Sequence, residues 1–216
     1  MKHIIKSNQP IIAPYTQDYI YKTSKLLSEN FTSKGVMETA LYINRDSFYT
    51  FINPICTKCG YQNNSFIAVD ESNTFLGALL NIDGMNKASL FDTIPSSLKP
   101  ISDFLSFMEE KYGSKTTDYN NELILFIIGV SLNCHPLLII QICIELYKCS
   151  ILLARVKGYK FITSLAVNPV TEFILKKFGF IAVGTYRYQD YKWCNNHVFN
   201  QVLESKGKAS YMKLIL

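Results

Sequence analysis

An apolar segment at residues 123–132, followed almost at once by a second at residues 136–156, most limits how this 216-residue chain can fold. Leu123–Leu132 is nearly continuous and is flanked by asparagines, which is typical of a central strand buried on both faces of a sheet. Pro136–Val156 is predicted to form a long helix, because its polar residues fall on one narrow stripe: Gln141, Glu145, Lys148 and Arg155. We expect this helix to be largely buried, with only the stripe in contact with water.

Neither segment is predicted to span a membrane. The most apolar stretches, Leu123–Val130 and Pro136–Leu146, are shorter than the roughly 20 residues that a bilayer-spanning helix needs. The net charge is +5, and the Lys and Arg residues are scattered rather than gathered in a basic run. Nucleic-acid binding is therefore not expected either.

The N-terminus and the cysteines bear on the compartment. The chain does not begin with a charged-then-apolar signal peptide, so its six cysteines are expected to be thiols in a reducing, intracellular compartment. The first 17 residues contain Lys2 and Lys6 but no acid. Both a cytoplasmic and an organellar location, including a mitochondrial one, stay open.

Strand and helix patterns alternate along the whole chain without repeats or a Pro/Gly/Ser-rich linker, so residues 1–216 are expected to form one α/β domain. The predicted order is β-α-α-β-β-α-β-α-β-α-β-β. Its strands are predicted at residues 10–15, 65–69, 74–81, 123–132, 159–166, 180–188 and 209–216. The first helix is expected to be capped by Asp18, and the second to run from about Glu38 to Ile55.

Local signals set the ends of the later helices. Gly158 is expected to stop the long helix. Asn168-Pro169 should begin the next one in the favoured order of N-cap and first helical residue. Gly179 is expected to end that helix, directly after a last turn that carries two lysines.

The second half of the chain resembles a known family. The segments similar to the core of the GNAT acetyltransferases are Val130-Ser131-Leu132, the long helix with its Gly158, Asn168-Pro169 and Lys176-Lys177-Phe178-Gly179-Phe180. The segments that resemble the arylalkylamine N-acetyltransferase branch are Phe104-Leu105, Glu109-Glu110-Lys111-Tyr112, Tyr186–Tyr191 and the closing strand. The resemblance implies a GNAT fold: a central, mixed, mostly antiparallel twisted sheet of about seven strands flanked by helices.

The resemblance also implies acetyl-CoA as the cofactor of an active member. In the family, a central strand splays from its neighbour to admit the pantetheine arm, and a turn of pattern Gln/Arg-x-x-Gly-x-Gly/Ala binds the pyrophosphate through backbone N–H groups. That turn is expected at Leu138–Cys143 here, yet the chain has no glycine between Gly129 and Gly158. The positions implied to contact the cofactor are Val130, Leu132, Gln141 and Asn168.

The catalytic positions of the family also differ. Many members protonate the departing thiolate with a Tyr four residues before the Gly of the Gly-Phe pair, where this chain has Leu175. The arylalkylamine branch uses a Glu-Pro soon after the first helix, and here Glu38 lies near that place but outside the pattern. No catalytic residue is assigned; the substitutes in principle are Ser131, His135, Tyr188 and Tyr191.

One further motif, Cys56-Thr57-Lys58-Cys59, has the spacing of half a zinc site. A second pair is missing, so zinc would have to recruit scattered residues: Cys134, His135, Cys194 or His197. We expect two thiols near a helix end rather than a metal site or a redox pair.

Two functions remain open. In the first, the fold is a structural or interaction subunit of a larger protein assembly without acetyl transfer, and its surface is rich in exposed aromatics such as Tyr42 and Phe48. In the second, it is an active acetyl-CoA-dependent N-acetyltransferase of a small arylalkylamine. The first predicts a cofactor cleft filled by Leu138, Ile139 and Ile140; the second predicts an open slot between the two central strands.

Overall fold

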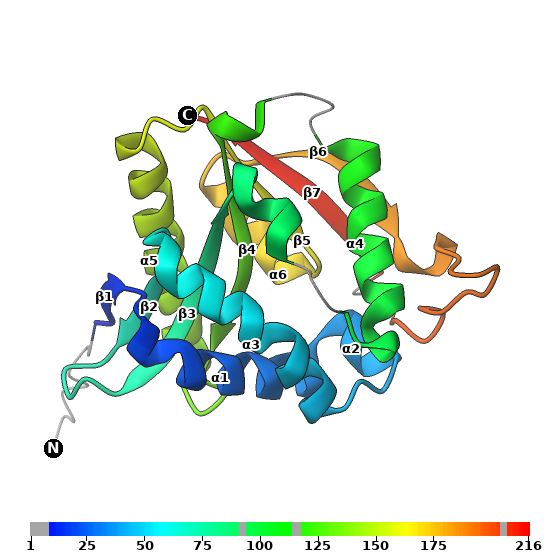
Figure 1. The fold of residues 1–216 in the computed structure, drawn as a ribbon, viewed down its shortest axis with the longest axis horizontal. Helices are drawn as coiled ribbons and strands as arrows, with labels where there is room; N and C mark the ends of the chain where they lie inside the picture. Colours follow the sequence, from blue (N-terminus) through cyan, green and yellow to red (C-terminus); the bar gives the residue numbers. More distant parts are fainter. Residues whose placement is uncertain (1–8, 91–93, 114–117, 204–206) are drawn as a thin grey trace, which may run out of the picture.

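The computed structural model describes residues 9–90, 94–113, 118–203 and 207–216, and its core is one seven-stranded sheet (Figure 1). The strand order is β1-β2-β3-β4-β5-β7-β6, and β4 and β5 are the parallel pair in a sheet that is otherwise antiparallel. The strands are β1 (Ile11–Pro14), β2 (Phe66–Val69), β3 (Phe75–Asp83), β4 (Glu122–Val130), β5 (Phe161–Ala166), β6 (Ile181–Arg187) and β7 (Lys208–Ile215).

Helices cover both faces of the sheet (Figure 1). One face carries α1 (Ile20–Lys34), α2 (Val36–Ala40), α3 (Arg45–Gln62) and α4 (Lys99–Tyr112). The other carries α5 (Pro136–Val156) and α6 (Pro169–Lys177). Each face therefore has its own apolar core, and β4 contributes side chains to both, as a strand with a continuous apolar sequence should.

The predicted start and stop signals of the later helices are confirmed. Gly158 and Gly179 follow the ends of α5 and α6 with φ of 78° and 88°, a left-handed conformation that glycine adopts without a Cβ penalty. The side chain of Asn168 accepts a hydrogen bond from the Thr171 backbone N–H at 2.9 Å, so it is the N-cap of α6. The order and type of the seven strands also agree with the sequence pattern.

Two predictions about the first helices are wrong. Asp18 lies in a short 3₁₀ turn, and α1 starts two residues later with Tyr19 as an N-cap that makes no side-chain bond. The stretch 38–55 belongs to two helices, because the chain turns at Tyr42, whose φ is 52°, and Asn44 caps α3 through the Ser47 N–H. Tyr42 is exposed as predicted, whereas Phe48 is buried.

The prediction that only a polar stripe of α5 meets water is also wrong. Leu137, Leu152 and Val156 are 71%, 59% and 85% exposed, because α5 lies on the surface of the sheet and its outward side is apolar too. By length and composition α5 is apolar enough to cross a membrane, although in the fold it packs against β2, β3 and β4.

Candidate active site

An opening between β4 and β5 divides the middle of the sheet. The two strands pair only from Glu122–Leu125 against Phe161–Ser164, and the Ser164 hydroxyl donates to the Leu125 carbonyl at 2.9 Å where the pairing ends. Beyond that bond β4 runs on to Val130 without pairing to β5. On its other side β4 keeps its pairing with β3 through a register shift that leaves Phe126 as an extra residue. Such a bulge bends its strand, which fits the departure of β4 from β5 at this point.

A cavity of about 730 Å³ occupies this opening. Its walls come from both faces of the sheet, since Phe31, Met37 and Leu105 line it from the first face and Ile139 and Cys143 from α5. It is large enough for a small-molecule ligand. The opening is thus an open slot between the two central strands, as the N-acetyltransferase hypothesis predicted.

The expected filling of the cleft does not occur. Of the three residues predicted to fill it, Ile139 lines the cavity, Leu138 packs into the core under α5, and Ile140 is 43% exposed. The reason is a wrong register: α5 already begins at Pro136, so residues 138–143 lie on the helix and their side chains point in different directions around it.

The turn that precedes α5 is residues 131–135, and it is not built to bind a pyrophosphate. It contains no glycine, and Pro136 at the first helical position has no N–H to offer. The Leu137 N–H already donates to Nδ1 of His135 at 3.3 Å. Burial raises the pKa of the Cys134 thiol against the opposing hydrogen bond with Ser131, and Asp70 adds a smaller rise, so a negative charge lies near this turn. A phosphate would find few free donors here.

Glu38 is the strongest candidate for chemistry in the cavity. It lies in α2, lines the cavity and is 5% exposed. Burial raises the pKa of its carboxyl group to about 7, against the opposing effect of hydrogen bonds from its own backbone N–H and that of Met37. A Cβ on Gly35 would overlap this carboxylate, so the glycine leaves the space that it occupies. A carboxyl group with this pKa can accept a proton at neutral pH.

Asn30 lines the same cavity and has an unused hydrogen-bond acceptor. Its Nδ2 donates to the Val130 carbonyl at 2.7 Å, whereas its buried Oδ1 has no hydrogen-bond partner among the described residues. A buried polar atom without a partner is costly in a folded protein. A ligand with an N–H or O–H group would satisfy it.

A second polar group lines the cavity further along β4 and β5. Lys87 Nζ is 2.7 Å from Glu109 Oε2, and the Tyr211 hydroxyl donates to Glu109 Oε1 at 3.1 Å. Thr163 also lines this part and donates to the buried Glu122, whose pKa is raised by burial. The cavity thus carries acidic groups in two separate places.

Three of the four predicted cofactor contacts line the cavity. Val130, Leu132 and Asn168 line it, so the structure brings these three together; that they bind a cofactor stays a prediction. Gln141 lies on α5, outside the residues that line the cavity.

The substitute acids are placed less favourably than Glu38. Tyr188 is fully buried and its hydroxyl donates to the Val167 carbonyl at 2.7 Å. Tyr191 packs edge-on against Phe104 at 5.0 Å, and His135 is the exposed N-cap of α5. Ser131 lies in the turn after β4, and Leu175 is buried in the core under α6.

The paired cysteines lie inside α3. Cys56 and Cys59 are fully buried, and burial raises the pKa of both thiols, to about 11 and about 12. Among the described residues, no three His, Cys, Asp or Glu side chains are grouped to hold a metal ion.

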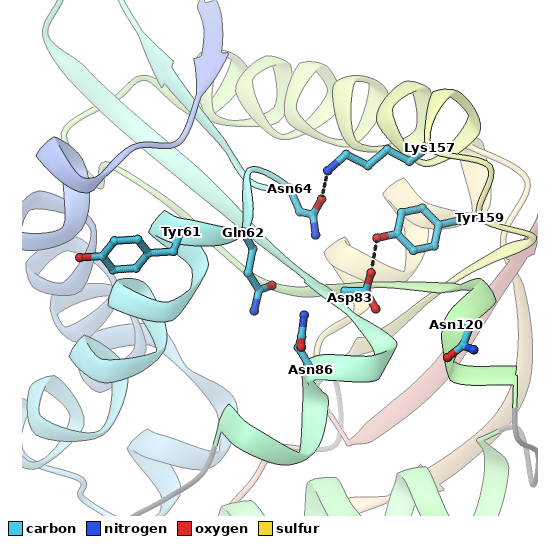
Figure 2. Close-up of a pocket in the computed structure, with 8 residues that line it drawn as sticks. All are labelled: Tyr61, Gln62, Asn64, Asp83, Asn86, Asn120, Lys157 and Tyr159. Carbon is cyan, nitrogen blue, oxygen red and sulfur yellow. Dashed lines mark hydrogen bonds between the residues drawn. The ribbon is translucent and has the colours of Figure 1, made fainter.

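A separate polar pocket of about 570 Å³ lies at the opposite ends of β4 and β5, and Figure 2 shows its lining residues. The Tyr159 hydroxyl donates to Asp83 Oδ2 at 2.7 Å, and Lys157 Nζ donates to Asn64 Oδ1 (Figure 2). Its charged side chains, Asp83 and Lys157, are therefore each engaged with a neutral neighbour. The larger cavity, with the buried Glu38 and the unpaired Asn30 oxygen, is the better candidate site.

Comparison with known proteins shows which solved structures share this fold. No family model matches the chain. The chain is similar to the C-terminal condensation domain of Ebony, solved in complex with β-alanyl-dopamine, with 18% identity, a TM-score of 0.85 and coverage of 96% of this chain and 99% of that one. It is also similar to arylalkylamine N-acetyltransferase 2 from Aedes aegypti, with 16% identity, a TM-score of 0.74 and coverage of 96% and 99%.

A third similar structure is the polyamine N-acetyltransferase of Drosophila melanogaster, with 13% identity, a TM-score of 0.68 and coverage of 95% of this chain and 100% of that one. These identities establish a common fold and no more. The chain has the GNAT fold, and its likeness to arylalkylamine N-acetyltransferases, which the sequence resemblance implied, is confirmed at the level of the fold.

Proposed function

We propose that this protein forms an amide bond between the acyl group of a thioester and a primary amine, with Glu38 as the general base. The observation that carries the proposal is the buried Glu38 carboxyl group, whose pKa is raised to about 7 and which lines a cavity at the opening between β4 and β5. A purely structural subunit would not need a ligand-sized cavity at the opening in its sheet.

The reaction balances on the groups present. The amine nitrogen attacks the thioester carbonyl, so a C–N bond forms and the C–S bond breaks. Glu38 takes the proton that the nitrogen loses and returns one to the departing thiolate. A base with a pKa near the working pH suits both transfers.

The acyl donor is expected to enter through the opening, with its extended arm along the unpaired part of β4. Asn30 Oδ1, the buried acceptor without a partner, would bind an N–H of that arm. The similar structures support transfer of an acyl group to an amine: one is a condensation domain solved with an aminoacyl amine, and others are amine acetyltransferases.

A protein partner is the preferred source of the donor, in place of free acetyl-CoA. The turn before α5 lacks glycine and has few free N–H groups, and residues 118–147 contain neither Lys nor Arg. A pantetheine arm attached to a protein would not need a pyrophosphate cradle in this chain. The exposed Leu132, Leu137 and Ile140 beside the opening would contact such a partner.

The test is amide formation by the purified chain. It would be mixed with phenethylamine or dopamine and with acetyl-CoA, S-acetyl-pantetheine or an acylated carrier protein, and the amide would be measured by mass spectrometry. We expect product with the pantetheine thioesters, and a loss of at least about 100-fold in kcat for Glu38→Gln, because general-base catalysis contributes about that much.

Asp46→Asn, which removes an exposed carboxylate at the start of α3, serves as the matched control and should keep full activity. Equal rates for wild type and Glu38→Gln would remove the role of Glu38. No amide from any donor and amine would return the structural-subunit hypothesis to first place.

A further inference from the structure

The polar pocket at the opposite ends of β4 and β5 differs in kind from the larger cavity. Its volume of about 570 Å³ suits a small molecule. Most small-molecule sites are lined mainly by apolar and aromatic side chains. The described residues that line this pocket are two tyrosines, one acid, one base and four carboxamides, with no Ala, Val, Leu, Ile or Met (Figure 2). A ligand that fits here is therefore polar over most of its surface.

Close packing fixes two walls of the pocket. Asn86 and Asn120 lie in the 3₁₀ turns that follow β3 and precede β4. A Cβ on Gly84 would lie 2.6 Å from the carbonyl oxygen of Tyr119, so only glycine lets the two turns approach this closely. The two carboxamides are therefore held on a preformed frame.

The two charged side chains of the lining stand at the ends of one chain of polar contacts. Lys157 Nζ donates to Asn64 Oδ1 and, at 3.2 Å, to the Asn63 carbonyl, while the Tyr159 hydroxyl donates to Asp83 Oδ2 at 2.7 Å. Burial and the bond to Asp83 raise the pKa of Tyr159, and a hydrogen bond with Asn64 opposes the rise. Tyr159 thus keeps its proton and, with Asn64, connects the base to the acid.

This arrangement favours a ligand without net charge. An anion attracted by Lys157 would also meet the carboxylate of Asp83, and a cation attracted by Asp83 would meet Lys157. The charged residues that neighbour a lining residue in the sequence are Lys87 and Lys160. Lys87 is paired with Glu109 in the larger cavity, and Lys160 is exposed to water. Neither adds a charge to the lining.

The lining keeps hydrogen-bonding capacity of both kinds. Gln62 extends among the lining residues (Figure 2), and its Oε1 is buried without a partner in the described part of the chain. A ligand hydroxyl that donates to this oxygen, after a rotation of the side chain, would remove the cost of leaving it unpaired. Asp83 accepts from the Tyr159 hydroxyl and from the Met85 N–H at 2.9 Å, which leaves about two of its four acceptor positions. Lys157 uses two of its three donors in the contacts above.

We propose that this pocket is a second binding site, separate from the cavity at the sheet opening, and that it takes a neutral polyhydroxylated molecule such as a sugar or a cyclic polyol. A hydroxyl group is both donor and acceptor. One such molecule therefore offers donors to Gln62 and Asp83 and acceptors to Lys157 and the other carboxamides. The proposal does not rest on amide formation, and it would stand if that function were refuted.

The experiment titrates the purified chain with two neutral probes, glucose and myo-inositol, and two charged ones, glucose 6-phosphate and glucosamine. Binding is followed in two-dimensional amide NMR spectra. We expect saturable shifts with at least one neutral probe, largest for the backbone amides of Asn86 and Asn120, and no tighter binding of the charged probes.

Two variants with matched controls locate the site. Gln62→Ala should weaken binding of the neutral probe roughly fivefold, and Lys157→Met roughly tenfold, because hydrogen bonds to neutral and charged groups contribute about that much. Gln17→Ala, at an exposed glutamine before α1, and Lys160→Met, at an exposed lysine outside the lining, should bind like the wild type. Thermal unfolding checks that every variant is folded.

Three results would overturn the proposal. The first is the absence of a saturable shift with both neutral probes at roughly 100 mM. The second is tighter binding of glucose 6-phosphate that Lys157→Met abolishes, because the pocket would then be an anion site. The third is equal binding of the neutral probe to the wild type, Gln62→Ala and Lys157→Met, because the probe would then bind elsewhere.

Discussion

The Nδ2 atom of Asn30 donates a 2.7 Å hydrogen bond to the carbonyl oxygen of Val130, which fixes α1 to the end of β4 beside the opening in the sheet. The oxygen of the same amide group is buried and has no hydrogen-bond partner among the described residues, and Asn30 is one of the residues that line the cavity. One side chain thus links the scaffold to the place where a donor arm would lie.

Replacing Asn30 by Ala should separate these two roles. Loss of the bond to Val130 should lower the free energy of unfolding by about 1–2 kcal/mol. Loss of the Oδ1 acceptor should weaken binding of S-acetyl-pantetheine roughly tenfold. Urea denaturation and calorimetry measure the two effects, with the exposed Ser33→Ala on α1 as the control. Unchanged thioester affinity in Asn30→Ala would show that the oxygen does not contact the donor arm.

Replacing Glu38 by Gln should stabilise the fold at neutral and alkaline pH. The carboxyl pKa is about 7 in the folded protein against 4.5 in the reference state, so the folded protein binds more protons between these values. The free energy of unfolding of the wild type should therefore fall as pH rises from about 4.5 to 7, and then stay level. Gln carries no such charge, and its advantage above pH 7.5 should reach up to roughly 3 kcal/mol.

Urea denaturation of both proteins at pH 5 and pH 8 measures this difference. It should be small at pH 5 and large at pH 8. If the two proteins show parallel pH dependence, the carboxyl group ionises as it does in water and is not the poised base that we propose.

The pH dependence of amide formation should report the same group. Below pH 7, kcat/KM should fall close to tenfold per pH unit, because the protonated Glu38 cannot accept the proton of the amine. Above pH 7 it should level off, and Asp46→Asn should follow the same curve. A rate that keeps rising to pH 9 would instead report loss of the proton from the free amine in solution.

Gly35→Ala should reduce activity by displacing Glu38. A Cβ at Gly35 would overlap the Glu38 carboxylate and approach the Phe31 carbonyl, so the carboxylate must move away from the start of α2. We expect kcat to fall at least tenfold and the apparent pKa of the rate profile to shift. Gly60→Ala is the matched control, because its Cβ would meet nothing nearer than 3.5 Å. Full activity in Gly35→Ala would mean that the carboxylate has freedom to work from another position.

The order of the strands and helices along the chain, and the long helix in particular, could be predicted from sequence because their signals are local and strong. The apolar run that became β4 and the Pro136–Val156 helix needed only hydrophobic pattern and a proline at the first helical position. The exposed apolar side of α5 could not be predicted this way, since an apolar residue on a helix does not reveal which side the sheet covers.

The candidate base was missed for a different reason. Glu38 lies near the catalytic place that the resemblance implies, but no proline follows it and it falls outside the family pattern, whereas the proposal for it rests on its burial and on the backbone hydrogen bonds at the start of its helix. Its neighbour Gly35, whose missing side chain makes room for the carboxylate, was the available signal. The family resemblance places the phosphate-binding turn at Leu138–Cys143, inside the helix that the hydrophobic pattern itself predicts from Pro136, and the structure shows that the helix is correct.

Four residue pairs join β4 to β5, and they are the link between the β1–β4 half of the sheet and the β5–β7 half. Past Ser164 the facing backbones of the two strands are not bonded to each other, so the protein carries an internal sheet edge. An extended ligand arm placed there would act as a short guest strand and tie the two halves together. Acyl donors would then be recognised largely through the backbone groups of β4 and β5. Because every residue type carries these groups, many side chains could be substituted without loss of this recognition.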